Sequence, residues 1–255
     1  MTTGTDPAIS CVSWNIHRGK GNDGRVDPDR TRDVLLTEVV QPDTAVLVLQ
    51  EADEDCHPHR GFLDIPGIEA ATGLRHAHSD GNLRWGAESH GFLGVVFFLS
   101  PEVLVEDATL LDLPGHCHRG AVVLDAQYHG RHLRLIGTHL SLGQPARIAQ
   151  MRVIGQHLQR RTPRQTILIG DLNEWRPWGG IAFSPRLVGQ RLHGPARSSF
   201  PVARPFLPLD RILTTPPGRV EDMRALDGPG IRMASDHRPV TARVTLKGVP
   251  AGSPV

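Results

Sequence analysis

The chain has 255 residues, of which 39% are hydrophobic, enough to bury a core of ordinary size. The formal net charge at pH 7 is +1, so the composition gives no support to a strongly basic polyanion-binding protein of the histone type. An enzyme that contacts only a short phosphate-bearing ligand is compatible with this charge.

The cysteines and the chain start bear on the compartment. Cys11, Cys56 and Cys117 are scattered and form no CxxC pair, so neither a disulfide framework nor a thiolate zinc site is predicted. Residues 1–7 lack the basic start and apolar stretch of a signal peptide. No apolar run approaches the ~18 residues of a membrane span. We therefore expect a cytoplasmic protein, and the sequence shows no sign of an obligate protein partner.

The first predicted element is a strand over 8–15, in which alternation places Asn15 on an apolar face. A Gly-rich loop over 18–24 follows. It lacks the spacing of a nucleotide-binding loop, and we interpret it as a turn. A helix is then expected from Asp27, a plausible N-cap, to Pro42.

The second predicted strand, over 44–51, is apolar on both faces, which indicates a strand covered on both sides. Alternation puts Glu51, at its end, on the face of Leu47. Residues 52–91 are rich in loop-forming residues, with a short helix expected near 68–73. Most of the histidines in such polar segments, including those near positions 57, 76 and 78, are expected to be solvated.

Buried strands are predicted over 92–99 and 103–111, and the segments 120–127 and 132–139 are expected to form a hairpin. The second arm of the hairpin ends on His139, on its core-side face.

A helix over 145–161 precedes the most informative stretch of the chain. The apolar run 167–169 predicts a buried strand, and Gly170 allows a close approach of the backbone. Asp171 and Asn173 share one face of this strand, so a carboxylate and an amide reach the rim of a sheet together.

Shorter strands are predicted over 207–213, 220–226 and 240–246, and the first of them carries Asp210. The turn 235–239 contains an Asp-His pair. Strands with interposed helices and hairpins predict two packed mixed sheets flanked by helices, an α/β class. We expect one domain over residues 8–247, with disordered ends at 1–7 and 248–255.

Polar side chains therefore recur where apolar strands end. Each alone could be a turn residue or a buried structural group, but the repetition favours a shared site. Carboxylate and amide oxygens are the ligands that Mg²⁺ or Mn²⁺ prefers, whereas zinc would call for more histidine or thiolate. Imidazoles could take a proton from attacking water or hydrogen-bond a phosphoryl oxygen. The set is Asn15, Glu51, His139, Asp171, Asn173, Asp210, Asp236 and His237.

Six motifs carry a resemblance to a known family. They are Trp14-Asn15-Ile16-His17, Gln50-Glu51, Arg119-Gly120, Gly137-Thr138-His139-Leu140, Gly170-Asp171-Leu172-Asn173 and Ser235-Asp236-His237-Arg238-Pro239. In this order the chain resembles the endonuclease/exonuclease/phosphatase superfamily, which includes pancreatic deoxyribonuclease, abasic-site endonucleases, inositol polyphosphate 5-phosphatases and neutral sphingomyelinases. The resemblance implies a four-layer α/β sandwich and metal-dependent hydrolysis of a phosphate ester. Ser199-Phe200-Pro201 before Leu209-Asp210-Arg211-Ile212 resembles a bacterial subgroup of metal-dependent hydrolases.

The resemblance also implies roles for single residues. Glu51 corresponds to the principal metal ligand, with Asn15 beside it and Asp236 at the boundary of the metal site. Asp171 and Asn173 correspond to the pair that handles the attacking water and the scissile phosphate.

The remaining roles concern proton transfer and phosphate binding. His237 corresponds to the general base or acid and Asp210 to the carboxylate that orients it; whether the Asp or the His activates water stays open. His139 and Arg119 correspond to phosphate-contacting groups, together with Asn173. The abasic-site nucleases tend to have tyrosine at the position of His139, so that branch is disfavoured. His17 could belong to the site or only lie near it.

The leading interpretation is a divalent-metal-dependent phosphodiesterase or nuclease acting on a phosphate-ester substrate, with nucleic acid among the candidates. Two alternatives stay open. One is a small-molecule or lipid-headgroup phosphatase of the same family; the other is a non-catalytic phosphate-binding module on the same fold. A binding module would be expected to lack one of Glu51, Asp171, Asn173 or His237, and all four are present.

Overall fold

The computed structural model describes residues 6–115 and 118–247. The expected disorder of 1–7 and 248–255 therefore lies outside the described residues, except at positions 6 and 7. Pro7 accepts a backbone hydrogen bond from Leu246 N at 2.7 Å, so this residue is tied to the fold. No helix in the described ranges is long and apolar enough to cross a bilayer.

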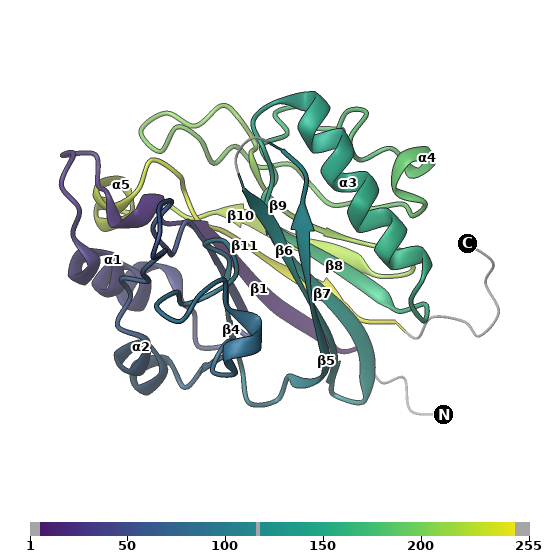
Figure 1. The fold of residues 1–255 in the computed structure, drawn as a ribbon, viewed down its shortest axis with the longest axis horizontal. Helices are drawn as coiled ribbons and strands as arrows, with labels where there is room; N and C mark the ends of the chain where they lie inside the picture. Colours follow the sequence, from purple (N-terminus) through teal and green to yellow (C-terminus); the bar gives the residue numbers. More distant parts are fainter. Residues whose placement is uncertain (1–5, 116–117, 248–255) are drawn as a thin grey trace.

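Two mixed β-sheets pack face to face and confirm the predicted α/β sandwich (Figure 1). The first has the order β10-β11-β1-β2-β4-β3, with only β1 and β2 parallel. Its strands are β1 (Ala8–Asn15), β2 (Val46–Gln50), β3 (Arg75–His76), β4 (Val96–Leu99), β10 (Arg219–Ala225) and β11 (Val240–Thr245). The second has the order β5-β6-β7-β8-β9, with β7 and β8 parallel. Its strands are β5 (Leu104–Leu113), β6 (Arg119–Tyr128), β7 (Arg131–His139), β8 (Gln165–Asp171) and β9 (Asp210–Thr214).

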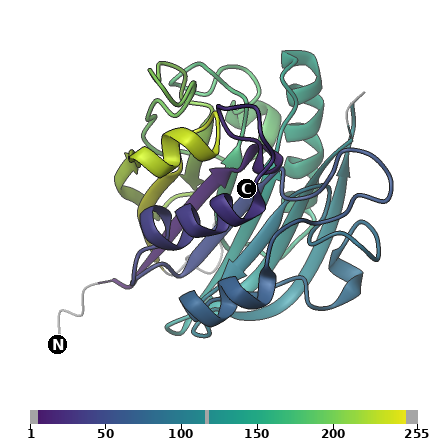
Figure 2. The ribbon, with the colours of Figure 1, turned by 90° about the vertical axis from the view of Figure 1, so that its left-hand side faces the viewer.

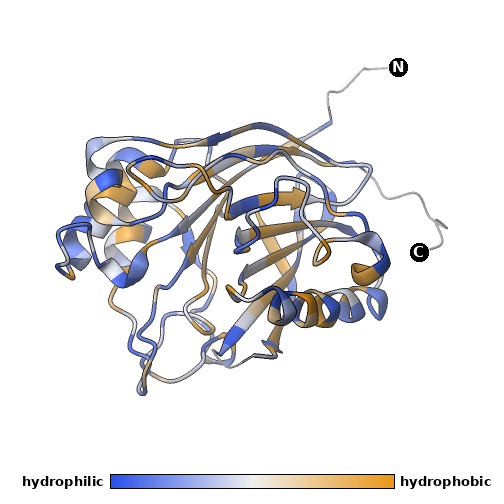
Figure 3. Cartoon of the chain, turned by 90° about the horizontal axis from the view of Figure 1, so that it is seen from above, coloured by the Kyte–Doolittle hydropathy of each residue, from blue (hydrophilic) through white to orange (hydrophobic). Residues whose placement is uncertain are grey.

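Helices cover the outer face of each sheet. The first sheet is covered by α1 (Pro28–Val34), α2 (Ile65–Thr72) and α5 (Pro229–Ala234), which face the viewer in Figure 2. The second is covered by α3 (Gln144–Gln159) and α4 (Pro185–Val188). The central core lies between the sheets and includes Ile9, Val48, Leu135 and Ile167. Figure 3 shows hydrophobic segments in the strands at the centre of the molecule, while the helices carry hydrophilic turns on the outside.

Local signals in the sequence explain several element boundaries. The Asp27 side chain accepts a hydrogen bond from Arg30 N at 2.9 Å, which confirms it as the N-cap of α1. The helix continues as one π-helical segment, Leu35–Val39. In the β6–β7 hairpin, His129 and Gly130 both have positive φ (47° and 74°), as the two central residues of a type I′ turn require.

One strand differs in burial from the expectation. The segment 103–111 was expected to be buried, but β5 is an edge strand that pairs only with β6, and most of its residues are exposed or half-buried. Leu104 is 56% exposed. Charged side chains line this edge, and Asp107 pairs with Arg161 of the segment after α3 at 2.8 Å. Such charges keep an open edge from pairing with other chains.

The histidines of the β3 region also differ from expectation, because His76 and His78 are buried. His78 Nδ1 lies 2.7 Å from Leu83 O, and its Nε2 accepts a hydrogen bond from Phe97 N at 3.0 Å. Both ring nitrogens are thus engaged in a neutral imidazole that links a polar loop to β4. The polar sequence around these histidines predicted exposure to solvent. The ring of His78 can be buried because both of its nitrogens have hydrogen-bond partners.

This burial predicts a pH dependence of stability. Burial lowers the pKa of His78 to about 4, against an ordinary value of 6.5. The unfolded chain therefore binds more protons between these values, and stability present above pH 6.5 is lost as the pH falls towards 4, by about 3 kcal/mol for this residue. When the free energy of unfolding is measured with urea at several pH values in this range, it should change less steeply with pH in His78→Gln than in wild type. His57→Gln, at an exposed position, is the matched control; equal slopes in all three proteins would contradict the assignment.

Candidate active site

The strand ends that carry the candidate residues meet at one end of the sandwich. Pairing in the second sheet places His139 beside Asp171, and Asp171 beside Asp210. In the first sheet Asn15 pairs with Gln50, directly before Glu51. Because β1 runs parallel to β2 and β7 runs parallel to β8, their carboxyl ends deliver side chains to the same edge.

Glu51 reaches the site by a route that alternation does not predict. Leu47 and Leu49 face the helices over the first sheet, while Val48 faces the inter-sheet core. Simple alternation would therefore send Glu51 towards the helices. The strand ends at Gln50, however, and Glu51 has φ +56°. This left-handed residue turns the carboxylate towards Asn15, so the predicted face of Glu51 was wrong.

The Asn15 amide bridges two carboxylates. Its Nδ2 donates to Glu51 Oε1 at 3.2 Å and to Asp171 Oδ2 at 3.0 Å, while its Oδ1 accepts from His17 N at 3.0 Å. Asn15 and Asp171 are buried, at 2% and 1% exposure. Two carboxylates held close together by a shared donor form a strongly anionic centre, which a cation would stabilise.

His139 and Asn173 form one wall of this centre. Asn173 Nδ2 donates to Leu140 O at 2.9 Å and lies 3.2 Å from His139 Nε2. His139 Nε2 is also 3.4 Å from Asp171 Oδ2. Burial lowers the pKa of His139 to about 3, despite the opposing charge of Asp171. The contact between His139 and Asp171 is therefore that of a neutral imidazole and not an ion pair.

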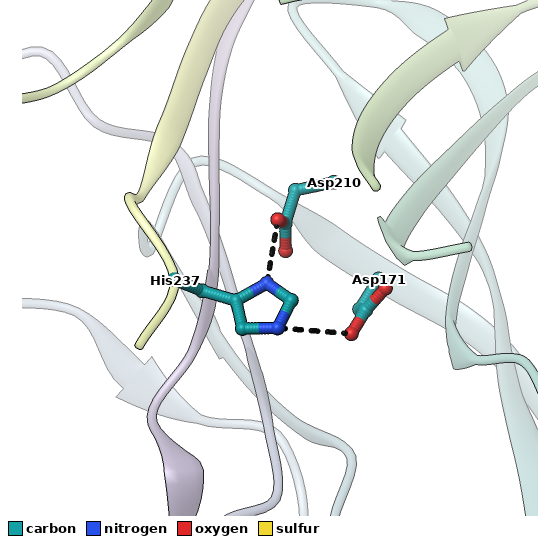
Figure 4. Close-up of side chains that lie close together, drawn as sticks. All are labelled: Asp171, Asp210 and His237. Atoms are coloured by element: carbon teal, nitrogen blue, oxygen red, sulfur yellow. Dashed lines mark hydrogen bonds and ion pairs between the residues drawn. The ribbon is translucent and has the colours of Figure 1, made fainter. Parts of the chain in front are cut away.

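His237 also faces Asp171, but the charges around it act in the other direction; Figure 4 shows its ring between Asp210 and Asp171. Its Nδ1 lies 2.8 Å from Asp210 Oδ2, and its Nε2 lies 3.7 Å from Asp171 Oδ2. Ser199 Oγ donates to Asp210 Oδ2 at 2.5 Å. Burial opposes a charge on the ring, but Asp210 and Asp171 outweigh it and raise the pKa of His237 to about 10. His237 is thus charged and His139 neutral, because only His237 has a direct hydrogen bond to a carboxylate.

Three further candidates lie towards the mouth of the site. Asp236 Oδ1 is 3.5 Å from His17 Nδ1, and both side chains are about one-third exposed. This places Asp236 beside His17 at the rim. Arg119 lines a pocket of about 360 Å³ together with Glu51 and His139, and its buried Nε has no hydrogen-bond partner among the described residues. Its guanidinium is therefore able to accept an anion there.

Two groups of residues could hold a cation. Ligand atoms of Asp171, Asp210 and His237 all lie within 4.8 Å of one another. We favour the other group, Glu51 and Asp171 bridged by the Asn15 amide, because the imidazole of the first group is bonded to Asp210 and held in its charged form. A protonated imidazole has no lone pair to offer a metal.

Sequence reasoning missed the buried charges that brace the site loops. Arg147 of α3 is 1% exposed; its Nη1 donates to Ser141 O at 3.1 Å and its Nη2 lies 3.5 Å from Glu174 Oε2. Glu174 follows Asn173, and Ser141 follows the β7 end that carries His139. The pair therefore ties together the two loops that form one wall. An arginine in the apolar stripe of a predicted helix is the signal that could have indicated it.

Comparison with known proteins agrees with this geometry. The model of the Endonuclease/Exonuclease/phosphatase family matches residues 12–237. The chain belongs to this family. The match contains Asn15, Glu51, Asp171, Asp210 and His237 within one family domain.

Individual members are distant. The uncharacterized protein YbhP of Escherichia coli K12 is 28% identical over 122 residues, which is 46% of this chain and 48% of YbhP, so the match spans about half the length of that relative. Two solved structures share the family fold. One is D. rerio TDP2 complexed with single strand DNA product (TM-score 0.61, 18% identity, 94% of this chain and 99% of that chain). The other is the mannosyl-6-phosphatase Bt3783 of Bacteroides thetaiotaomicron (TM-score 0.62, 14% identity, 92% and 99%). At these identities the two structures support the fold alone.

Proposed function

We propose that this family member is a divalent-metal-dependent phosphoesterase, with phosphodiester hydrolysis by attack of water on phosphorus as the leading reaction. The observation that carries the proposal is the placement of Asp171. Its Oδ2 lies 3.0 Å from the Asn15 amide on one side and 3.7 Å from His237 Nε2 on the other. One carboxylate therefore contacts both the Asn15 amide, beside the proposed cation site, and an imidazole held by Asp210. Figure 4 shows the second of these contacts.

The donor set fits a hard cation. Glu51 would hold Mg²⁺ or Mn²⁺ next to Asp171, because both residues offer carboxylate oxygens and the described residues of the site include no thiolate. Asn15, whose oxygen accepts from His17 N, would orient the two carboxylates through its Nδ2. Asp236 would add negative charge from the rim. When bound, the cation polarises a phosphoryl oxygen and offsets the negative charge that builds on it during attack.

The chain's own groups would handle the water and its protons. His237 Nε2 and Asp171 Oδ2 lie 3.7 Å apart, close enough for both to hydrogen-bond one water. Because the ring is held in its charged form, Asp171 would take up the proton of the water, while His237 would donate a hydrogen bond and supply a proton to the leaving oxygen. Asp210 fixes the ring by its bond to Nδ1, so that Nε2 keeps facing the site. An imidazole oriented by a carboxylate in this way can transfer protons at its other ring nitrogen.

Phosphate contacts would come from the opposite wall. Neutral His139, with Asn173 beside it, offers a hydrogen bond to a phosphoryl oxygen. Arg119 lines the adjoining pocket, where its guanidinium would bind a second oxygen. These groups act before and during attack, since they meet charge that grows on the phosphoryl oxygens.

The substrate class is the open part of the proposal. TDP2 was solved with single-stranded DNA product, and Bt3783 is described as a mannosyl-6-phosphatase, so a common fold serves different phosphate esters. A nuclease remains our leading candidate, and a small-molecule or lipid-headgroup phosphatase is the second. A non-catalytic binding module is disfavoured because Asp171 and His237 are both present and face one another at 3.7 Å.

A substrate panel tests the proposal. We expect bis(p-nitrophenyl) phosphate to be hydrolysed with Mg²⁺ or Mn²⁺, with activity lost in excess EDTA and restored by added metal. The panel then compares single-stranded DNA, abasic duplex, RNA, inositol phosphates and sphingomyelin. Binding that weakens steeply with salt would indicate a nucleic-acid substrate. Full activity in excess chelator would rule out the proposal.

Two broader points belong to the same proposal. We take residues 8–247 to be one domain, which is supported by an inter-sheet core drawn from strands of both halves of the chain. A cytoplasmic location is supported by the free thiols of Cys11 and Cys56. Cys117 lies outside the described residues.

A further inference from the structure

An arginine is bound to the proposed metal ligand. Arg18 Nη1 donates to Glu51 Oε2 at 2.6 Å, and Nη2 donates to Asp55. The backbone is tied at the same place, since Arg18 N donates to Glu51 O at 3.2 Å. The guanidinium lines the pocket that also contains Arg119 and His139. The Arg18 guanidinium is thus bonded to the Glu51 carboxylate, which a divalent cation would also need as a ligand.

The backbone holds this arginine in place at a cost. His17, Arg18 and Glu51 have φ of 48°, 50° and 56°, a region that non-glycine residues seldom adopt. Such residues persist where the surroundings enforce them, and they gather at functional sites. The buried Arg18 Nε has no hydrogen-bond partner in the described part of the chain. The guanidinium is therefore held by its two carboxylates and not by a full set of structural bonds.

We propose that Arg18 competes with the divalent cation for Glu51 and so lowers the metal affinity of the site. This inference rests on the proposed function. Glu51 Oε1 is taken by the Asn15 amide and Oε2 by Arg18, so a metal that binds Oε2 must displace the guanidinium. Asp55 would keep the displaced arginine at the pocket mouth. Without metal, Arg18 neutralises a carboxylate that otherwise lies unpaired beside Asp171.

Metal titration of Arg18→Gln tests this competition. Isothermal titration calorimetry should show Mg²⁺ and Mn²⁺ bound roughly fivefold more tightly than in wild type, the size expected for losing one partly exposed ion-pair competitor. The rise in Tm on adding Mg²⁺ should grow in parallel. Arg60→Gln is the matched control, because it removes the same charge from an exposed pair with Glu88. Its metal affinity should stay within about twofold of wild type.

The outcomes separate the two proposals. Metal affinity in Arg18→Gln that is unchanged or weaker would overturn the competition, as would an equal gain in Arg60→Gln. A wild-type protein that binds neither Mg²⁺ nor Mn²⁺ would instead refute the proposed function. If Arg18→Gln does not fold, Arg18→Lys carries the test: an ammonium cannot reproduce the two-pronged contact, so metal affinity should rise by a smaller factor.

Discussion

Replacing His237 by alanine is expected to lower kcat for phosphodiester hydrolysis by about 1,000-fold, within the range that a positioned acid–base group contributes. The affinity for Mg²⁺ should stay close to wild type, because His237 bonds to Asp210 and faces Asp171 without touching Glu51 in the described contacts. The loss would therefore fall on turnover and leave the cation site in place. Single-turnover kinetics with saturating metal, beside calorimetric Mg²⁺ titration, measures the two effects separately.

Two variants sharpen this test. Asp210→Asn removes the charge that raises the pKa of His237, so the limb of the pH–rate profile that reports this group should move to lower pH. His132→Ala, at an exposed position near the start of β7, is the control and should keep wild-type kinetics. A His237→Ala protein with near-wild-type turnover would show that the imidazole is not part of the reaction, whatever its position.

The strand ends of the site could be predicted because strong local signals lead to them. Apolar runs before Asn15 and Asp171 indicated buried strands, and alternation placed each residue on one apolar face of its strand. In the structure these are the faces that pack between the sheets. The same pattern of polar residues beside apolar strands selected Asp210 and His237, but their separation of 27 residues in the chain gives no hint of a 2.8 Å contact. Pairing between β8 and β9 brings Asp210 to the site, and only the fold supplies that pairing.

Other features could not be predicted, because they depend on backbone turns or on tertiary hydrogen bonds. Glu51 leaves the alternating pattern through one left-handed residue, which no apolar periodicity encodes. The loop that contains Arg18 looked like an ordinary turn, yet it sends a guanidinium onto Glu51. His78 stands in a polar segment and is buried because two backbone groups satisfy its ring. Each case is a tertiary contact that overrides a local preference.

Glu51→Gln is expected to weaken Mg²⁺ binding by at least about 100-fold and to remove most metal-dependent activity, since a metal site with so few carboxylates loses its main charge. Calorimetry with Mg²⁺ and Mn²⁺ measures the affinity, and Glu102→Gln, at an exposed position in the turn before β5, is the control. The neutral amide also leaves Arg18 with Asp55 as its charged partner in place of Glu51. An Arg18→Gln substitution should therefore tighten metal binding in the wild-type background but have little effect beside Glu51→Gln, because the two side chains act on one oxygen. Undiminished metal affinity in Glu51→Gln would instead assign the cation to the group of Asp171, Asp210 and His237. If Arg18→Gln then tightened metal binding equally with and without Glu51→Gln, Arg18 would act only as a distant charge.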